Sequence, residues 1–356
     1  MRAPAWNVVA PPVAVVVLVA TWGTKPGWLL AVGIGLFLAA AVLAAVHHAE
    51  VVAHRVGEPF GSLVLAVAVT VIEVALIVTL MVSGGHGTET LARDTAFAAV
   101  MITCNGILGL SILVGALRRH IAEFNPEGSG TALAAVITVT TLSLVLPTFT
   151  TSAPGPEFSS AQLAFAAIGS LTLYGLFVLV QTVRHRDYFL PVSDAGDDEH
   201  APPPTDRDAL RSVGLLVIAL VAVVGLAKTE SPAIEDGVEA AGFPSSAVGV
   251  VIALLVLRPE SRAAFRAARR DRVQTSLNLA LGSAMASIGL TIPAIAVASI
   301  WLEGPLILGL GATQMVLLAL TAVVGVLTVV PGRATLLESG LHLVIFAAFL
   351  FLAANP

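Results

Sequence analysis

Long apolar runs follow one another along almost the whole chain, and they decide its fold class. A run of about twenty residues can cross the roughly 30 Å hydrocarbon core of a bilayer as a helix, whereas barrel strands are short and alternate in polarity. Hydrophobic residues make up 57% of the 356 residues, and charged residues make up only 12%. Soluble domains carry roughly 25% charged residues. The sequence therefore predicts an all-α integral membrane protein and excludes a membrane barrel.

The apolar runs predict about eleven transmembrane helices. Fifteen of the eighteen Lys and Arg residues then fall on one side of the membrane, and the other side holds only Lys25, Arg93 and Lys228. Because cytoplasmic loops carry the excess of Lys and Arg, the N-terminus is expected in the cytoplasm and the C-terminus outside. The expected spans are 6–22, 28–53, 60–83, 94–117, 131–150, 159–183, 209–227, 233–257, 273–300, 304–330 and 334–353.

A hydrophilic segment, SDAGDDEHAPPPTDRD, interrupts the apolar runs near the middle of the chain. Its acidic and Pro-rich composition cannot bury a core, so residues 184–208 are interpreted as a cytoplasmic linker. An extra N-terminal helix then occupies 1–27, a first five-helix repeat 28–183 and a second 209–356. Because five is odd, the two repeats start on opposite sides of the membrane, as in the inverted repeats of many secondary transporters. The acidic run of the linker, either solvated or cation-sensing, comprises Asp194, Asp197, Asp198, Glu199 and His200.

The stretch AVAVTVIEVALIV, residues 66–78, contains a single ionisable residue, Glu73. An ionisable group at that depth costs at least roughly 2.5 kcal/mol and normally faces a cavity or a partner. Burial favours the neutral carboxyl, while a neighbouring cation favours the carboxylate. Glu73 can thus exchange a proton for a metal ion. The alternative is a neutral side chain that only forms a hydrogen bond to a neighbouring helix.

Two further spans could supply neutral oxygen ligands. The run AAVMITCNGILGLSILVG contains Asn105, with glycines such as Gly109 that allow close helix approach or exposed backbone carbonyls. It also contains the lone cysteine Cys104, which is expected to be a packing residue. The run NLALGSAMASIGLTIP, residues 278–293, places Ser283 and Ser287 close to one helix face. Both patterns are compatible with a cation path, and both are also typical of polar packing between helices.

Two polar groups near the cytoplasmic side each admit two interpretations. Glu260 follows Pro259 at the end of an apolar run, where a broken helix would open a site. It also lies in the Arg-rich segment LRPESRAAFRAARRDR, where it could be an interfacial charge. His47, Glu50 and His54 are spaced i, i+3, i+7, so they share a helix face. They could relay protons or bind a metal at the inner mouth, or could simply form a polar cap.

Several stretches together resemble the bacterial calcium/proton antiporters of the ChaA type, in the cation/proton exchanger branch of the calcium/cation antiporter superfamily. They are GEPFGSLVLAVAVTVIEVALI, MITCNGILGLSILVGALRRH, LVLPTFTTS, VQTVRHRDYFL and RPESRAAFRAARRDRVQTSLNLALGSAMASIGLTIP. The resemblance implies ten core helices in two inverted halves, with a glutamate in the second and seventh. That pattern falls on Glu73 and Glu260, and the polar positions of the partner helices fall on Asn105, Ser283 and Ser287. The chain has VTVIE and LRPES where other branches carry a glycine-asparagine-x-x-glutamate signature.

The sequence and the resemblance together predict a secondary transporter, not an enzyme, that exchanges cytoplasmic Ca²⁺ for protons. Calcium prefers six to eight hard oxygen ligands, which two glutamates with amide, hydroxyl and carbonyl oxygens could supply. Na⁺ and K⁺ are further or alternative substrates, and a channel-like conductor without proton coupling is the second hypothesis. No ATP is expected, because the chain has no Walker-type motif, and the missing H-E-x-x-H motif argues against a membrane enzyme. No cofactor and no nucleic acid are expected either. The expected partners are the cations, protons and the lipid bilayer of a bacterial inner membrane.

Overall fold

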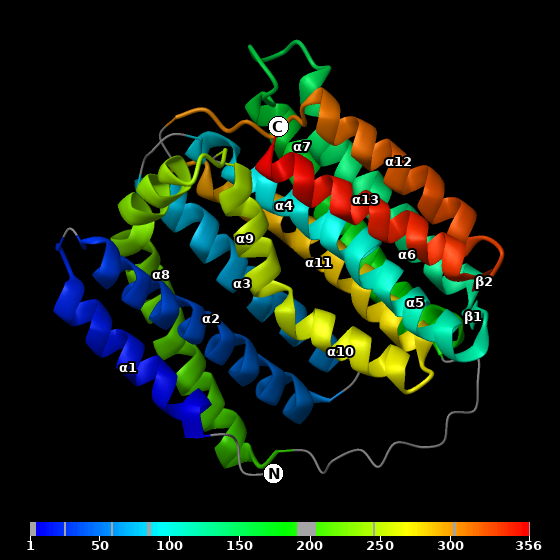
Figure 1. The fold of residues 1–356 in the computed structure, drawn as a ribbon, viewed down its shortest axis with the longest axis horizontal. Coiled ribbons are helices and arrows are strands. Elements are labelled where there is room, and N and C mark those ends of the chain that lie inside the picture. The colour runs from blue at the N-terminus through cyan, green and yellow to red at the C-terminus, as the bar shows by residue number, and fades with distance from the viewer. Residues whose placement is uncertain are drawn as a thin grey trace. The chain divides into compact units, whose positions relative to one another are not determined.

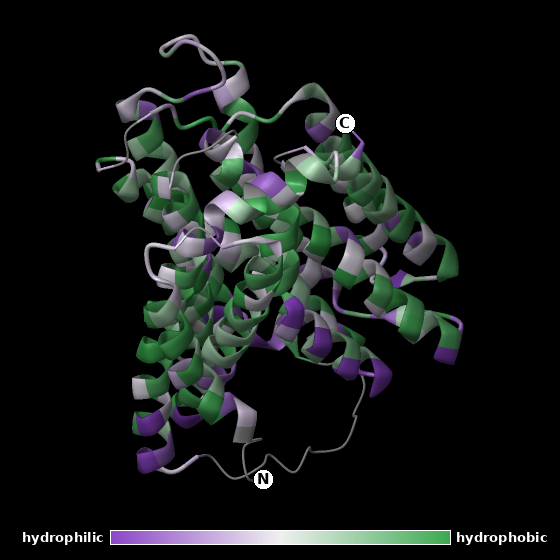
Figure 2. Cartoon of the chain, turned by 60° about the vertical axis from the view of Figure 1, so that its left-hand side comes forward, coloured by the Kyte–Doolittle hydropathy of each residue, from purple (hydrophilic) through white to green (hydrophobic). Residues whose placement is uncertain are grey.

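The computed structural model describes residues 5–24, 26–57, 60–83, 87–190, 204–244, 246–301 and 304–355. Within these residues the chain is almost entirely helical, with one short antiparallel pair of strands, β1 (Ala122–Glu123) and β2 (Arg333–Ala334) (Figure 1). Hydrophilic residues gather at helix ends and in connections, and the middle turns of the helices are mostly apolar (Figure 2). This pattern confirms the predicted all-α membrane fold. Most of the predicted linker, including its acidic run, lies outside the described residues.

The chain forms two compact units, and each unit contains parts of both halves of the sequence. The first unit takes Met1–Leu91, Glu199–Val256 and Trp301–Glu303, and the second takes Ala92–Asp198, Leu257–Ile300 and Gly304–Pro356. The helices of the first unit are α1 (Ala5–Thr21), α2 (Trp28–Val56), α3 (Phe60–Ser83), the 3₁₀ turn η1 (Thr88–Thr90), α8 (Asp206–Ala240) and α9 (Ser246–Val256).

The second unit contains the remaining helices, several of which are interrupted by π-helical or 3₁₀ turns. Its α-helices are α4 (Leu91–Met101), α5 (Leu108–Arg119), α6 (Pro126–Thr140), α7 (Ser160–Leu179), α10 (Arg258–Arg269), α11 (Val273–Ala298), α12 (Ala312–Val329) and α13 (Leu336–Ala354). The π-helical turns are η2 (Ile102–Ile107), η3 (Thr141–Val145) and η5 (Val180–Arg184), and the 3₁₀ turns are η4 (Leu146–Thr148) and η6 (Arg186–Phe189).

Nine helical segments in the described part of the chain are long and apolar enough to span a membrane. Two more apolar helices, Trp6–Thr21 and Ser246–Val256, are shorter. Each predicted span overlaps one of these helices, but the predicted count of eleven spans is not confirmed. The repeat boundaries also stay predictions.

The largest difference from the prediction concerns α8. The sequence predicts a loop containing Lys228 between two spans, but α8 runs unbroken from Asp206 to Ala240. Lys228 is exposed, while Glu230 is buried within the helix. The helix tolerates Pro232 because neighbouring helices can compensate for the backbone hydrogen bond that proline removes. The carboxyl of Glu230 and the proline, which lie between the two predicted spans, are therefore both accommodated within one helix.

In the first unit, α2 and α8 pack closely and run antiparallel. One hydrophobic core joins α1, α2, α3, α8 and α9, and alanines of α2 and α8 form much of it. Near the end of α2, His48 Nδ1 lies 3.3 Å from Ser212 Oγ, and Arg55 Nε donates to Asp206 Oδ1 at 2.7 Å. Both partners belong to the first turns of α8, so the end of α2 lies beside the start of α8.

In the second unit, α11 and the segment formed by α4, η2 and α5 are the most buried of the described membrane-spanning helices. Ser276 of α11 is buried and forms hydrogen bonds to two other helices. Its Oγ lies 2.6 Å from Ser111 Oγ of α5 and 2.7 Å from the backbone oxygen of Ala264 in α10. Because a buried hydroxyl is stable only when it is hydrogen-bonded, these contacts fix α5, α10 and α11 against one another.

Gly128, in the first turn of α6, provides a test of packing in the second unit. A Cβ atom there would lie 2.3 Å from the backbone oxygen of Tyr188, so alanine would force the backbone to move. We expect Gly128→Ala to destabilise the protein by about 1–3 kcal/mol, measured as a lower melting temperature in detergent. Gly130→Ala is the matched control, because nothing lies within 4 Å of its Cβ position. Equal melting temperatures for the two variants would contradict this packing.

Candidate cation-binding site

Glu73 lies in α3 of the first unit and is 3% exposed. It is the one ionisable residue of that helix. Its neighbours Ile72 and Ile77 are fully buried, and Leu76 is nearly so. The expected burial of this carboxyl in the apolar part of a membrane helix is therefore confirmed. A carboxyl in such surroundings is stable only when it is neutral, hydrogen-bonded or close to a cation.

Asn105 lies in the second unit, within the π-helical turn η2, and is fully buried. Its Nδ2 donates to Thr321 Oγ1 of α12 at 2.9 Å, and its Oδ1 lies 3.1 Å from His342 Nδ1 of α13. π-Helical turns inside α-helices often mark functional positions, because the extra residue redirects side chains and backbone carbonyls. In this structure the Asn105 amide is held by two neighbouring helices. Its role as a cation ligand stays a prediction.

His342 completes this buried network and was not singled out from the sequence. It is fully buried, and its Nε2 lies 3.1 Å from Thr328 Oγ1. Because the Asn105 amide oxygen only accepts hydrogen bonds, Nδ1 of His342 carries the proton and Nε2 accepts from Thr328. A Cβ atom on Gly109 would lie 2.9 Å from the His342 Cβ, so this glycine permits the close approach of α5 and α13. The predicted function of this glycine in helix packing is thus confirmed.

The serine pattern of α11 lies in the second unit and is only partly buried. Ser287 is buried, and Ser283 is half-buried. Asn278, at the start of the same pattern, accepts from Gln274 Nε2 at 2.7 Å and donates to the backbone oxygen of Phe189 at 2.6 Å. Asn278 therefore ties α11 to η6, while the two serines stay predicted ligands.

Glu260 lies in the first turn of α10, just after an interruption of the helix. Helix α9 ends at Val256 and α10 begins at Arg258, so the predicted break occurs at Leu257, where the chain also passes from the first unit to the second. Glu260 is half-buried. Glu73 belongs to the first unit, and Glu260 belongs to the second with Asn105 and the two serines. The Arg-rich segment forms an amphipathic helix, as its pattern predicts, with the exposed arginines Arg262, Arg266 and Arg269.

The three residues of the predicted proton relay lie at the end of α2, and the relay stays a prediction. His47 Nδ1 lies 4.0 Å from Glu50 Oε2, whereas His54 is exposed. The buried residue of this group is His48, which was passed over in the sequence. Its Nε2 lies 3.0 Å from the backbone oxygen of Asn7, so His48 connects α1 with α2 and α8.

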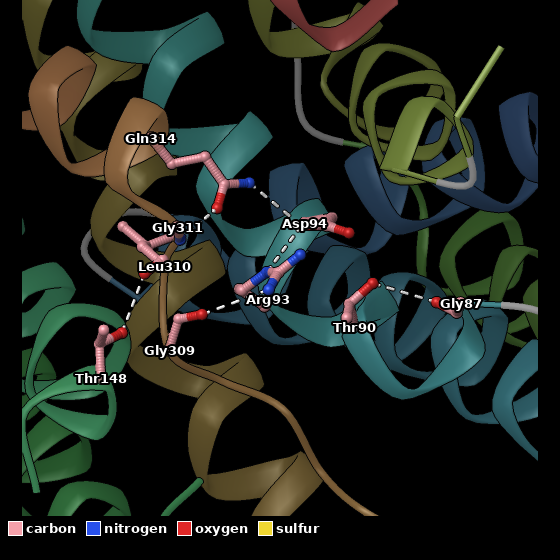
Figure 3. Close-up of polar contacts among 9 residues, drawn as sticks. All are labelled: Gly87, Thr90, Arg93, Asp94, Thr148, Gly309, Leu310, Gly311 and Gln314. Carbon is pink, nitrogen blue, oxygen red and sulfur yellow. Dashed lines mark hydrogen bonds and ion pairs between the residues drawn. The ribbon is translucent and has the colours of Figure 1, made fainter. Parts of the chain in front are cut away.

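A buried ion pair at the start of α4 is a second feature that the sequence analysis missed (Figure 3). Arg93 Nε donates to Asp94 Oδ1 at 2.8 Å, and the two side chains are 16% and 3% exposed. Arg93 Nη1 also donates to the backbone oxygen of Gly309 at 3.2 Å, and Gln314 Nε2 donates to Asp94 Oδ1 at 3.2 Å. The pair therefore holds the segment before α12 against α4.

Asp94→Asn tests the energetic role of this ion pair. The substitution leaves the largely buried Arg93 without its carboxylate, which costs roughly 1–3 kcal/mol. We expect a lower melting temperature and little change in the ion selectivity of transport. Arg333→Gln, at an exposed position in the same unit, serves as the control for loss of a charge. An Asp94→Asn variant as stable as this control would show that the pair contributes nothing.

Comparison with known proteins identifies the class of this membrane protein. The family model described as sodium/calcium exchanger protein matches residues 26–183 and 211–355. The chain belongs to the sodium/calcium exchanger protein family. Among relatives of this exchanger, the y4hA protein of Sinorhizobium fredii is 48% identical over 332 residues, which cover 92% of this chain and 89% of the relative. Its name describes an ionic transporter and specifies no ion.

Two further proteins are similar to this exchanger, one in sequence and one in structure. The sodium-potassium/proton antiporter ChaA of Escherichia coli is 33% identical over 346 residues, which cover 95% of this chain and 93% of the relative. The crystal structure of the H⁺/Ca²⁺ exchanger CAX has the same fold, with a TM-score of 0.73 at 17% identity over 97% of this chain and 86% of that one. The exchanger is therefore a multi-pass membrane transporter, and the names of its relatives differ in the ion.

Proposed function

We propose that this exchanger moves Ca²⁺ out of the cytoplasm in exchange for protons. The buried carboxyl of Glu73 carries this proposal, because it is an ionisable group inside a membrane-spanning helix of an exchanger-family protein. Its protonated form is compatible with burial, and its ionised form is compatible with a bound cation. The same group therefore holds a proton or a cation, and it does not hold both at once.

Glu260 is the proposed carboxylate of the second half. Its position in the first turn of α10, after the interruption at Leu257, leaves backbone groups near the break that are not part of a continuous helix. Asn105, Ser283 and Ser287 are proposed neutral oxygen ligands, which Ca²⁺ requires in addition to carboxylates. The access of these ligands would alternate between the two sides of the membrane, as in other transporters built from repeats.

The direction of transport follows from the charge distribution and the proton gradient. We place the exchanger in a bacterial inner membrane with its N-terminus in the cytoplasm, because the predicted cytoplasmic side carries most Lys and Arg residues. Protons moving inward would then drive the cation outward. His47 and Glu50, which lie 4.0 Å apart at the end of α2, would exchange protons with water at the cytoplasmic side.

A monovalent cation is the second candidate substrate, and the relationship to ChaA favours it. That protein is named as a sodium-potassium/proton antiporter and is 33% identical to this chain. The name of CAX favours Ca²⁺, although CAX is only 17% identical. Ca²⁺, Na⁺ and K⁺ all prefer oxygen ligands and differ in size and charge. A transport measurement with each ion therefore decides between them.

Purified exchanger in lipid vesicles with an internal pH dye tests the proposed function. A proton gradient is imposed, and Ca²⁺, Na⁺ or K⁺ is added in turn. We expect Ca²⁺ to dissipate the gradient, and a response to Na⁺ or K⁺ alone would assign the chain to monovalent exchange. Movement of labelled Ca²⁺ without any proton movement would contradict antiport and favour a channel-like conductor.

A further inference from the structure

A second buried carboxyl lies in the first unit, and the proposed exchange mechanism does not use it. Glu230 belongs to α8 and is 5% exposed. Its Oε2 atom is buried and has no hydrogen-bond partner among the residues that the structure describes. Such an atom is rare in folded proteins, because burying an unpaired polar group costs free energy. Its presence within a membrane-spanning helix indicates a function.

The carboxyl of Glu230 lies against a glycine of α2. A Cβ atom on Gly35 would be 3.9 Å from Glu230 Oε1, which is an ordinary van der Waals distance. Ile34, next to this glycine, and Leu226, one turn earlier on α8, are fully buried members of the hydrophobic core. The carboxyl is therefore in low-dielectric surroundings, where an isolated negative charge is strongly disfavoured.

The described helices that pack against α8 bring no basic side chain close to Glu230. Helices α1 and α9 contain no ionisable residue, and α3 contains only Glu73. The ionisable residues of α2 lie between His47 and Arg55, at least twelve positions from Gly35. On α8 itself, Lys228 is exposed. In this part of the chain, nothing described neutralises a negative charge at Glu230.

Pro232 leaves a backbone carbonyl without its helical partner two residues before Glu230 in the chain. Proline has no backbone N–H, so the carbonyl of Lys228 lacks its usual helical donor. A free carbonyl at this level can accept a hydrogen bond from a neutral carboxyl or from water. The same missing bond weakens α8 at the position where the carboxyl is buried.

We propose that Glu230 is a second proton-binding site, which holds a proton in the resting exchanger and releases it during cation exchange. One carboxylate supplies too few oxygen atoms for the six to eight ligands of Ca²⁺, so the ligand is a proton. The protonated carboxyl has no net charge and is therefore compatible with burial. Its coupling to cation exchange rests on the proposed function, whereas its protonation does not.

Infrared spectroscopy of the full-length protein in lipid vesicles tests the protonation directly. A protonated carboxylic acid gives a carbonyl band that disappears on ionisation. Protonated Glu73 contributes a band of its own, so the signal of Glu230 is the difference between wild type and Glu230→Gln. Near neutral pH we expect Glu230→Gln to lose part of the wild-type band and Asp236→Asn to retain all of it. Glutamine has the shape of protonated glutamate, and Asp236 is exposed on the same helix, so it controls for loss of an acidic residue. Identical spectra for Glu230→Gln and wild type would overturn the proposal.

Proton release on cation binding tests the coupling. Ca²⁺, Na⁺ or K⁺ is added to weakly buffered protein in detergent, and a pH dye reports the protons released per protein. We expect wild type and Asp236→Asn to release one more proton than Glu230→Gln. Equal release of at least one proton from all three would show that the Glu230 proton is not exchanged, which also overturns the proposal. Failure of the proposed function gives a different result, in which no variant releases protons while the infrared band of Glu230 persists.

Discussion

Replacing Glu73 with glutamine is expected to abolish cation-driven proton movement while the protein stays folded. Glutamine has the shape and neutral charge of the protonated side chain, so the buried position in α3 accepts it. It cannot release a proton, and it cannot bind a cation as a carboxylate. A charged ligand is worth about 3 kcal/mol, so its loss reduces cation affinity roughly 100-fold. At cation concentrations below saturation, the initial rate of proton movement in vesicles should fall roughly 100-fold or more.

Two controls make the Glu73 experiment specific. Asp236→Asn removes an exposed carboxylate from the same unit and is expected to keep most of the wild-type rate. The melting temperature of Glu73→Gln in detergent is expected to equal or exceed that of wild type, because a buried ionisable group is removed. Wild-type proton movement in Glu73→Gln would exclude this residue as the shared site, whatever the ion.

Replacing His342 with phenylalanine is expected to have the largest effect on stability. The variant leaves Asn105 Oδ1 and Thr328 Oγ1 without their partner in the core of the second unit. Each unsatisfied buried group costs roughly 1–3 kcal/mol, so the total cost is about 2–6 kcal/mol. At 2–4 °C per kcal/mol for a unit of this size, the melting temperature should fall by roughly 5–20 °C.

The same histidine variant should also slow transport, because Asn105 loses one of the two contacts that orient its amide. Thr328→Val removes only one partner of His342 and is expected to have a smaller effect on both properties. Leu341→Ala, at an exposed neighbouring position in α13, is the control for changes to the helix itself. A His342→Phe variant as stable as Leu341→Ala would show that the network does not support the fold.

Helix bounds followed from the sequence where polar residues flank a uniformly apolar run. Helix α3 spans Phe60–Ser83, as predicted, and α11 begins at Val273, also as predicted. Helix α8 was divided wrongly, because Lys228, Glu230 and Pro232 are typical of a loop when only neighbours along the chain are considered. The burial of Glu230 depends on packing against α2, which local sequence does not reveal.

Some residues of the buried polar sites could be predicted from the sequence, and others could not. Glu73 stands alone in an apolar run, so its burial could be predicted directly. His342 also lies in an apolar run, within the predicted span 334–353, and the criterion applied to Glu73 would have identified it. Asp94 is the first residue of a predicted span and is typical of an interfacial charge. Its contact with Gln314 joins positions 220 residues apart, which no local pattern indicates.

The interleaving of the two units has a consequence for how the protein is made. The first hydrophobic core takes residues from α1 to α3 and also from α8 and α9, which follow more than a hundred residues later. Because synthesis proceeds from the N-terminus, α1 to α3 are inserted long before their partners exist. Until α8 has been synthesised, the alanine-rich face of α2 lacks the helix against which it packs in the folded unit. The first unit therefore assembles only after four of the second unit's eight α-helices, α4 to α7, have been synthesised.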